Sequence, residues 1–180
     1  MSKAEEVLSD IERKVERGEL TPIIAGPVKG RILVEIVREI KPKHVLEIGT
    51  FVGYSAILRG KLENDSQLIT IEIDPYVAEI ARANVRKAEL SAKIKVLVGD
   101  ALKIISKLEG RFDLVFIDAD KRQYLDYLRL IEDKLHKGSF IIADNAECAP
   151  NYLNYVRQSG KYKSKYILTS ADALEVSVKL

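Results

Sequence analysis

Short apolar runs alternate with amphipathic stretches between about residue 40 and residue 145. The runs are rich in β-branched residues, whereas the stretches place apolar side chains every three to four positions, a helical spacing. This alternation predicts a parallel sheet with helices on both faces, because parallel strands need crossover connections. The expected strands are 44–48, 68–73, 94–98, 113–117 and 140–143. The expected helices are 3–18, 28–40, 54–61, 75–88, 101–108 and 121–135.

The end of the chain follows a different pattern. Two β-rich segments, 165–169 and 174–179, are separated only by residues 170–173. That connection is too short for a helical crossover, so the two strands must be antiparallel. The sequence therefore predicts an α/β, doubly wound, Rossmann-like fold, with a mostly parallel seven-stranded sheet that finishes in a C-terminal antiparallel hairpin.

Composition is that of a soluble protein that forms one domain. The chain has 180 residues, of which 47% are hydrophobic and 31% charged, and its net charge of +2 gives no field favouring nucleic acid or membrane. Its single cysteine, Cys148, excludes an internal disulfide and suits a reducing cytosol. The first residues lack the apolar core of a signal peptide, and no apolar run approaches membrane-spanning length. We therefore expect a cytoplasmic protein with no membrane partner.

Polar side chains follow two of the expected strands at the point where each strand ends. Asp118, Asp120 and Lys121 come after the fourth strand, and Asp144 and Asn145 follow the fifth. The carboxyl ends of parallel strands line one crevice, so these side chains are expected to converge. Oxygen ligands beside an amine suit a divalent metal next to a general base. Taken singly, each also has an ordinary explanation as a helix N-cap, a solvated lysine or a turn.

A glycine turn follows the first expected strand, with Gly49 and Gly53 in a Gly-x-x-x-Gly spacing. This spacing lacks the full pyrophosphate cradle of the dinucleotide motif. Glu47, just before the turn, repels a pyrophosphate and favours an ammonium group. Glu72 ends the second strand and suits ribose hydroxyls, and Asp100 follows the third strand, where an adenine edge is expected. Ribose, ammonium and adenine without pyrophosphate describe S-adenosylmethionine better than a nicotinamide dinucleotide.

Several motifs together make the chain resemble a known family. They are LEIGTFVGYS (46–55), IEID (71–74), GDA (99–101), FIDADK (116–121) and IIADN (141–145), with GPVKG (26–30) upstream. With them the chain resembles the class I S-adenosylmethionine-dependent methyltransferases, and within these the metal-dependent catechol and caffeoyl-coenzyme A O-methyltransferases. The resemblance divides the single domain 1–180 into an N-terminal helix (1–20), a cofactor and metal core (21–145), and a shortened acceptor region with the hairpin (146–180).

The resemblance implies a role for each matching residue. Lys121 would be the catalytic base. A divalent cation, Mg²⁺ with Mn²⁺ or Ca²⁺ as substitutes, would be held by Asp118, Asp144 and Asn145. The residues that would contact S-adenosylmethionine are Ala25, Glu47, Gly49, Thr50, Ser55, Glu72, Asp100, Ala101, Asp118 and Asp120.

The implied activity is methyl transfer to a hydroxyl of a small catechol-like acceptor, by an enzyme that forms a homodimer. Two alternatives stay open. One is a tRNA hydroxyuridine O-methyltransferase, because residues 151–170 interleave tyrosines with lysines and arginine and contain no acid. A solvated helix and edge strand whose tyrosines pack inward explains the same segment without RNA. The other alternative is a non-catalytic S-adenosylmethionine-binding protein.

Overall fold

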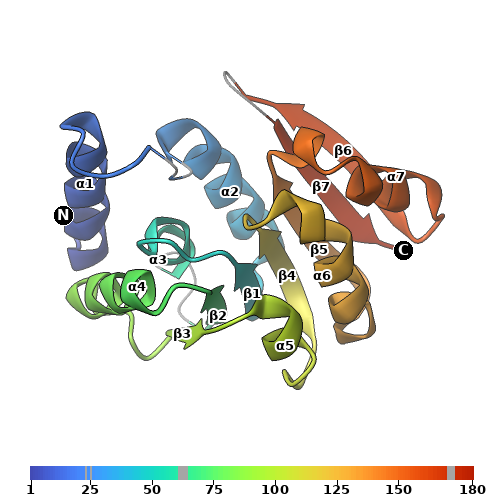
Figure 1. Cartoon of the computed structure of the whole chain (residues 1–180), viewed down its shortest axis with the longest axis horizontal. Helices are drawn as coiled ribbons and strands as arrows, with labels where there is room; N and C mark the ends of the chain where they lie inside the picture. The colour runs from blue at the N-terminus through green and yellow to red at the C-terminus, as the bar shows by residue number, and fades with distance from the viewer. Residues whose placement is uncertain (23, 25, 61–64, 170–172) are drawn as a thin grey trace.

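The protein is built around one seven-stranded sheet (Figure 1). The structure, a computed structural model, describes residues 1–22, 24, 26–60, 65–169 and 173–180. The strands are β1 (His44–Ile48), β2 (Gln67–Glu72), β3 (Ile94–Val98), β4 (Phe112–Ile117), β5 (Leu135–Asp144), β6 (Tyr162–Leu168) and β7 (Ala173–Lys179). Their order is β3-β2-β1-β4-β5-β7-β6, and β7 runs antiparallel to both β5 and β6. The mostly parallel sheet with an antiparallel C-terminal hairpin is therefore confirmed.

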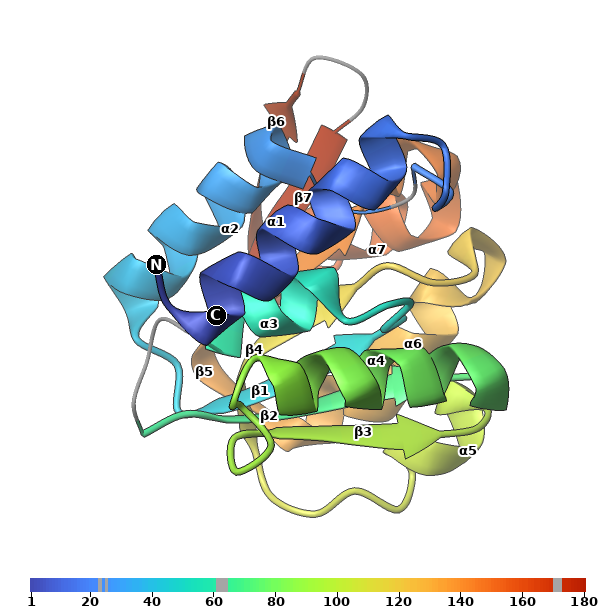
Figure 2. The same ribbon diagram turned by 90° about the vertical axis from the view of Figure 1, so that its left-hand side faces the viewer.

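Helices cover both faces of the sheet, as expected. Helices α1 to α4 pack on one face and α5 to α7 on the other (Figure 2). The helices are α1 (Lys3–Glu16), α2 (Gly26–Ile40), α3 (Tyr54–Gly60), α4 (Pro75–Lys87), α5 (Ala101–Ile105), α6 (Tyr124–Ile131) and α7 (Pro150–Gln158). Three short 3₁₀ turns are η1 (Lys121–Gln123), η2 (Glu132–Lys134) and η3 (Ala146–Cys148). No helix in the described part of the chain is both long and apolar enough to span a bilayer.

Strand β4 shows why the central strands read as unbroken apolar runs. Leu114 and Phe116 join the core under α1 to α4, whereas Val115 and Ile117 join the core under α5 to α7. Successive side chains of a strand point to opposite faces, and here both faces are covered, so every position must be apolar.

Several boundaries differ from the expectation: the helix expected at 101–108 ends at Ile105, and the strand expected at 165–169 begins at Tyr162. Two differences are larger. The helix expected at 121–135 is divided into η1, α6 and η2, and β5 begins at Leu135 rather than at residue 140. Leu135 is buried and pairs with Phe112, ahead of a register shift in the β4–β5 ladder. The polar residues after Leu135 and the left-handed Gly138 (φ +88°) interrupt the apolar run, so the first half of this strand carried no strand pattern.

The ends of β1 and β4 are pinned together by a close backbone contact. The amide of Asp118 donates to the carbonyl of Ile48 at 2.9 Å. The amide of Gly49 donates to the carbonyl of Ile71 at 3.0 Å. Gly49 has a φ of +93°, and a Cβ at this position would lie 1.9 Å from the carbonyl oxygen of Asp118. Only glycine fits this position, because it combines a left-handed backbone with no room for a side chain.

At the amino ends of the central strands, Asp113 links β1, β4 and β5. Its Oδ2 accepts the backbone amides of Lys43 and His44 at 2.7 and 2.8 Å, and its Oδ1 lies 2.9 Å from Nε2 of His136. The other ring nitrogen of His136 lies 2.9 Å from the carbonyl of Lys137. The Lys137 carbonyl and then Asp113 raise the pKa of His136. Burial opposes ionisation of Asp113, but its hydrogen bonds, the one from His44 foremost, lower the pKa of this carboxyl.

The Asp113–His136 contact should make stability depend on pH. The pKa of His136 is raised on folding, so its contribution is complete below the unfolded value of about 6.5 and is lost as the pH rises through the folded value. The depressed pKa of Asp113 means that its contribution is present above about 3.9 and lost as the pH falls through the folded value. We expect His136→Gln to lose up to about 1 kcal/mol in urea unfolding at pH 5.5 and almost nothing at pH 9. An equal loss at both pH values would show that the ion pair contributes nothing.

Gly49→Ala should destabilise the fold through its contact with Asp118. The added Cβ meets backbone rather than a flexible side chain, so we expect a loss of about 3–5 kcal/mol in urea unfolding. Gly110→Ala is the matched control, because Gly110 also has a positive φ (+86°) but has nothing within 4 Å of its added Cβ. That variant should lose only about 1–2 kcal/mol from backbone strain. Equal losses in the two variants would contradict the role of the close contact.

Candidate active site

A cavity of about 960 Å³ opens at the carboxyl ends of the strands, where the sheet order reverses between β1 and β4. This is the place where open α/β sheets bind ligands. Of the site residues predicted from the sequence, Ala25 lies outside the described residues and Glu47 does not line the cavity. The cavity is lined by all the others, namely Gly49, Thr50, Ser55, Glu72, Asp100, Ala101, Asp118, Asp120, Lys121, Asp144 and Asn145.

Glu72 is held at the cavity wall by backbone amides. Its Oε2 accepts from Phe51 at 2.8 Å and from Thr50 at 3.2 Å, and its Oε1 accepts from Asp74 at 3.1 Å. A carboxylate offers about four acceptor positions, so these three donors leave capacity for a ligand hydroxyl. The geometry is that of a fixed acceptor at the end of β2.

Asp100 and Asp120 both cap helical turns at the cavity edge. Asp100 accepts the amide of Leu102 at 3.0 Å at the start of α5. Asp120 accepts the amide of Arg122 at 3.1 Å and also pairs with its guanidinium, whose hydrogen bond lowers the pKa of the Asp120 carboxyl. Asp120 is therefore an N-cap, the ordinary explanation offered for it from the sequence, and it still faces the cavity.

A chain of polar contacts joins the ends of β4 and β5. The Lys121 ammonium donates to Asp118 Oδ1 at 2.9 Å and to the Tyr124 hydroxyl at 2.7 Å. That hydroxyl donates in turn to the carbonyl of Asp144 at 2.8 Å. Burial, followed by the charges of Asp118 and Asp144, raises the pKa of Tyr124, so its hydroxyl stays neutral. Tyr124 thus fixes the position of the Lys121 amine.

Asp144 is almost fully buried and is paired with a lysine from the other end of the chain. Lys29 donates to Asp144 Oδ1 at 2.7 Å and to Oδ2 at 2.9 Å, and the two side chains are only 12% and 4% exposed. Burial first, and then the charge of Asp118, raises the pKa of the Asp144 carboxyl, while Lys29 opposes this shift. The charge of Asp118 therefore disfavours ionisation of Asp144.

Glu47 is fully buried and contacts the cavity-lining Ser55, in a pair that the sequence did not reveal. Its Oε1 accepts from the Ser55 hydroxyl and from the Arg59 guanidinium, and both members of the ion pair are buried. Arg59 also lies over the ring of Phe116, 4.6 Å from its centroid. Burial lowers the pKa of Arg59, and Glu47 opposes the shift. The structure thus gives Glu47 a protein cation as one partner, and the contact with the methionine end of the cofactor that the resemblance implies for Glu47 stays a prediction.

Sequence reasoning missed Tyr124 and Arg59, and it named Lys29 only within an upstream motif. Two of them carried a signal. Arg59 is a lone charge at the end of an apolar helical segment, and Lys29 stands just before a second glycine in Gly26-Pro-Val-Lys-Gly30. Tyr124 shows nothing unusual, because a tyrosine three residues after Lys121 is an ordinary helix residue.

The tyrosines of segment 151–170 lie mainly inside the protein. Tyr152 and Tyr162 are buried in the core under α5 to α7, on helix α7 and strand β6. Tyr155 donates to Glu132 at 2.8 Å, an acceptor that it shares with Tyr162. These three rings are therefore used in packing, as the explanation without RNA expected, whereas Tyr166 is 39% exposed.

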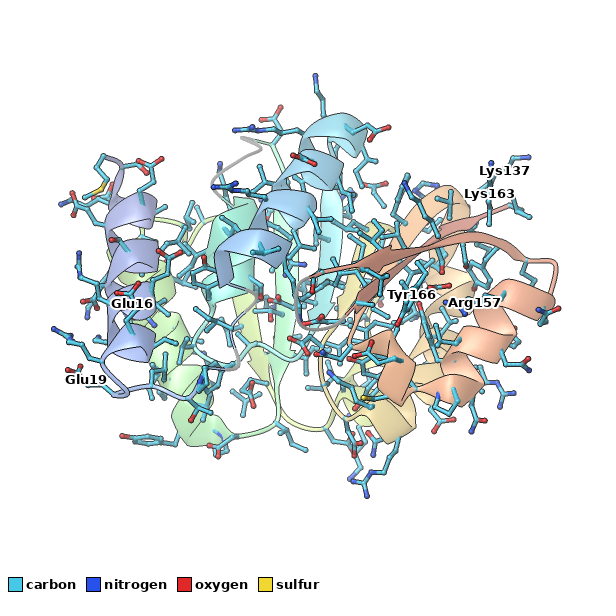
Figure 3. All side chains as sticks on the ribbon, turned by 90° about the horizontal axis from the view of Figure 1, so that it is seen from above. Glu16, Glu19, Lys137, Arg157, Lys163 and Tyr166 are labelled. Carbon is cyan, nitrogen blue, oxygen red and sulfur yellow. The ribbon has the colours of Figure 1, made fainter. Side chains whose placement is uncertain are left out.

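The basic residues of the same segment are only partly free. Arg157 forms a bidentate ion pair with the buried Glu175, from Nε to Oε1 at 2.8 Å and from Nη2 to Oε2 at 2.7 Å. Its guanidinium carbon lies 5.1 Å from the ring centroid of Tyr166. Figure 3 shows Lys163 and Lys137 at the same end of the molecule, whereas Glu16 and Glu19 lie at the opposite end. Lys163, near the start of β6, is exposed.

The Glu47–Arg59 pair can be tested by replacing its members singly and together. Glu47→Leu or Arg59→Leu alone leaves a buried charge without its partner, so each variant should lose about 3–5 kcal/mol of unfolding free energy in urea. Glu47→Leu/Arg59→Leu removes both charges and should lose less than either single variant. Additive losses in the double variant would show that the two side chains are not energetically coupled.

Comparison with known proteins places the chain in a family. The family model described as O-methyltransferase matches residues 1–168. Catechol O-methyltransferase B of Danio rerio is 38% identical over 171 residues, which cover 86% of this chain and 65% of that protein, less than two thirds of its length. Catechol O-methyltransferase of Sus scrofa is 37% identical over 169 residues, covering 85% and 91% of the two chains. A cofactor-bound crystal structure from MTB superposes with a TM-score of 0.88 at 27% identity, covering 97% of this chain and 89% of that one. The chain therefore belongs to the O-methyltransferase family.

Proposed function

We propose that this protein transfers a methyl group from S-adenosylmethionine to a hydroxyl oxygen of a small catechol-like acceptor, with the help of a divalent cation. The observation that carries the proposal is that Asp118, Lys121, Asp144 and Asn145 line the same cavity as Gly49 and Glu72. An acidic crevice with a fixed hydroxyl acceptor thus adjoins an amine and a set of oxygen ligands. Membership of the O-methyltransferase family supports the same reaction class.

Three features of the crevice support S-adenosylmethionine as the methyl donor. Gly49 lines the cavity at the turn after β1, and Glu72 keeps acceptor capacity for ribose hydroxyls. The wall includes the carboxylates of Asp100 and Asp118, which favour a cationic ligand over a pyrophosphate. When bound, S-adenosylmethionine supplies an electrophilic methyl group on a positively charged sulfur.

The metal ligands would be Asp118, Asp144 and the amide oxygen of Asn145. Hard oxygen donors of this kind suit Mg²⁺, and Mn²⁺ or Ca²⁺ can substitute. Asp144 already holds a cation, since both of its oxygens accept from the Lys29 ammonium. The described residues contain no group of three or more His, Cys, Asp or Glu side chains arranged for a metal, so the proposed set relies on an amide. A divalent cation there supplies charge that stabilises the oxyanion of the acceptor.

Lys121 is the proposed base that takes the proton of the acceptor hydroxyl. Its side chain is 26% exposed, lines the cavity, and is held by Asp118 and the neutral Tyr124 hydroxyl. A base fixed in this way is positioned before the acceptor arrives, which reduces the entropy that must be lost at the reaction step. The homodimer, the cytoplasmic location and the three-part division of the chain stay predictions.

The test is methyl transfer from labelled S-adenosylmethionine to a panel of catechols and to unmodified bulk tRNA, with Mg²⁺ or with EDTA. We expect labelling of a catechol that requires Mg²⁺. Lys121→Ala should lower kcat by about 10²–10⁴-fold, because general base catalysis contributes that much. Lys107→Ala, at an exposed lysine after α5, is the control and should behave as the unchanged protein.

Each other outcome would correct a specific part of the proposal. Labelling of tRNA alone would move the function to RNA modification. Labelling that survives EDTA would remove the metal from the mechanism. Full activity in Lys121→Ala would remove the assignment of the base, and binding of the donor without transfer to any acceptor would favour a non-catalytic role.

A further inference from the structure

Lys29 supplies a cation for the Asp144 carboxylate. We infer that Lys29 competes with the divalent metal for Asp144, so that the metal binds only when this ammonium leaves the carboxylate. The inference rests on the proposed function, because it takes Asp144 to be a metal ligand.

The contact is specific and largely shielded from solvent. One ammonium reaches both oxygens of Asp144, at 2.7 and 2.9 Å, and the amide of Asn145 adds a third donor at 2.9 Å. The side chains of Lys29 and Asp144 are 12% and 4% exposed, yet both line the cavity. Lys29 therefore stands at the boundary between the buried carboxylate and the open space where an incoming metal would arrive.

The packing of α2 explains how a residue 115 positions away reaches Asp144. Lys29 lies in the first turn of α2, next to Gly30, which is buried. A Cβ at Gly30 would lie 3.0 Å from Cδ2 of Leu58 on α3, so the absence of a side chain lets the two helices approach closely. The start of α2 is thus seated against α3, with the Lys29 side chain directed into the cavity.

An ammonium and a metal ion at the same carboxylate disfavour each other. A metal bonded to Asp144 would lie at contact distance from the Lys29 ammonium, and two cations repel strongly in a partly buried site. The long, flexible lysine side chain can instead swing into the cavity of about 960 Å³. The two arrangements of Lys29 therefore differ by a change of side-chain conformation.

The fraction of molecules in which Lys29 has left Asp144 sets the apparent affinity for the metal. If only a fraction of the molecules has Asp144 open, the apparent Kd for the metal equals the intrinsic Kd divided by that fraction. Removing the ammonium makes every molecule open and should therefore tighten metal binding. If Lys29 served only to stabilise the fold, its removal would not tighten metal binding.

The experiment measures binding of Mn²⁺ alone, by electron paramagnetic resonance, to the unchanged protein and to four variants. Lys29→Met keeps most of the side-chain volume without the charge and should lower the Kd by about tenfold, the value for a site that is open one tenth of the time. Lys29→Arg keeps the cation and should leave the Kd near or above that of the unchanged protein. Lys107→Met is the control for removal of one positive charge, and Asp144→Asn should weaken binding.

Thermal unfolding of the same proteins gives a second readout that does not depend on activity. In EDTA, Lys29→Met should have a lower Tm than the unchanged protein, because Asp144 is left buried without its cation. Saturating Mn²⁺ should then raise the Tm of Lys29→Met by more than it raises that of the unchanged protein, because the metal replaces the lost charge.

The outcomes separate this inference from the proposed function. Mn²⁺ binding that Asp144→Asn weakens, but that Lys29→Met leaves unchanged or weakens, would overturn the competition while keeping the metal site. Tightening by Lys107→Met as strong as that by Lys29→Met would also overturn it, because overall charge would then explain the effect. Absence of Mn²⁺ binding in every protein would overturn both the metal in the proposed function and the competition. Tightening by Lys29→Met alone, with a larger gain in Tm, is the expected result.

Discussion

The site depends on how closely the chain after β1 approaches the chain after β4. Gly49 lies directly against the carbonyl of Asp118, where no other residue fits without displacing the backbone. The sheet order reverses between these two strands, so their connections leave toward opposite faces and a crevice opens above their ends. The same contact brings Asp118 from β4 into the crevice that begins at β1. A ligand held against the Gly49 turn is therefore within the same cavity as the acids and lysines that follow β4 and β5.

A second constraint is the charge of three acids, each of which has a basic partner. Glu47 is paired with Arg59, Asp144 with Lys29, and Asp118 with Lys121. A carboxylate removed from water is strongly destabilising unless a cation or several donors compensate it, which accounts for a partner at each position. These three acids are thus each paired within the chain, although Oε2 of Glu47 and Nη1 of Arg59 stay buried with no hydrogen-bond partner among the described residues. A cationic ligand that approaches one of these acids must share it with the resident basic group or displace that group.

The fold and the acids of the cavity wall could be predicted because the rules involved are local. Strand β4 is buried on both faces and therefore reads as an apolar run, and the short connection after residue 169 forces an antiparallel pair. Acids that directly follow parallel strands meet at the carboxyl ends of those strands. The sequence therefore predicted that Asp118 and Asp144 lie at the same crevice. The same rules failed where the pattern was interrupted. Strand β5 starts at Leu135, before polar residues and a left-handed glycine, and α7 was expected only as the solvated helix of the explanation without RNA.

The sequence by itself determined the order of the elements, the direction of the strands and the set of acids at their ends. Only the tertiary structure decided which cation each acid meets. Lys29 and Asp144 are 115 residues apart, and their contact depends on the close packing of α2 on α3 at Gly30. Arg59 points to Glu47 because α3 covers the face of the sheet on which that carboxylate lies. Periodicity and strand ends are properties of residues that are close in the sequence. These pairings instead depend on how the helices pack on the sheet, and no local sequence pattern specifies that packing.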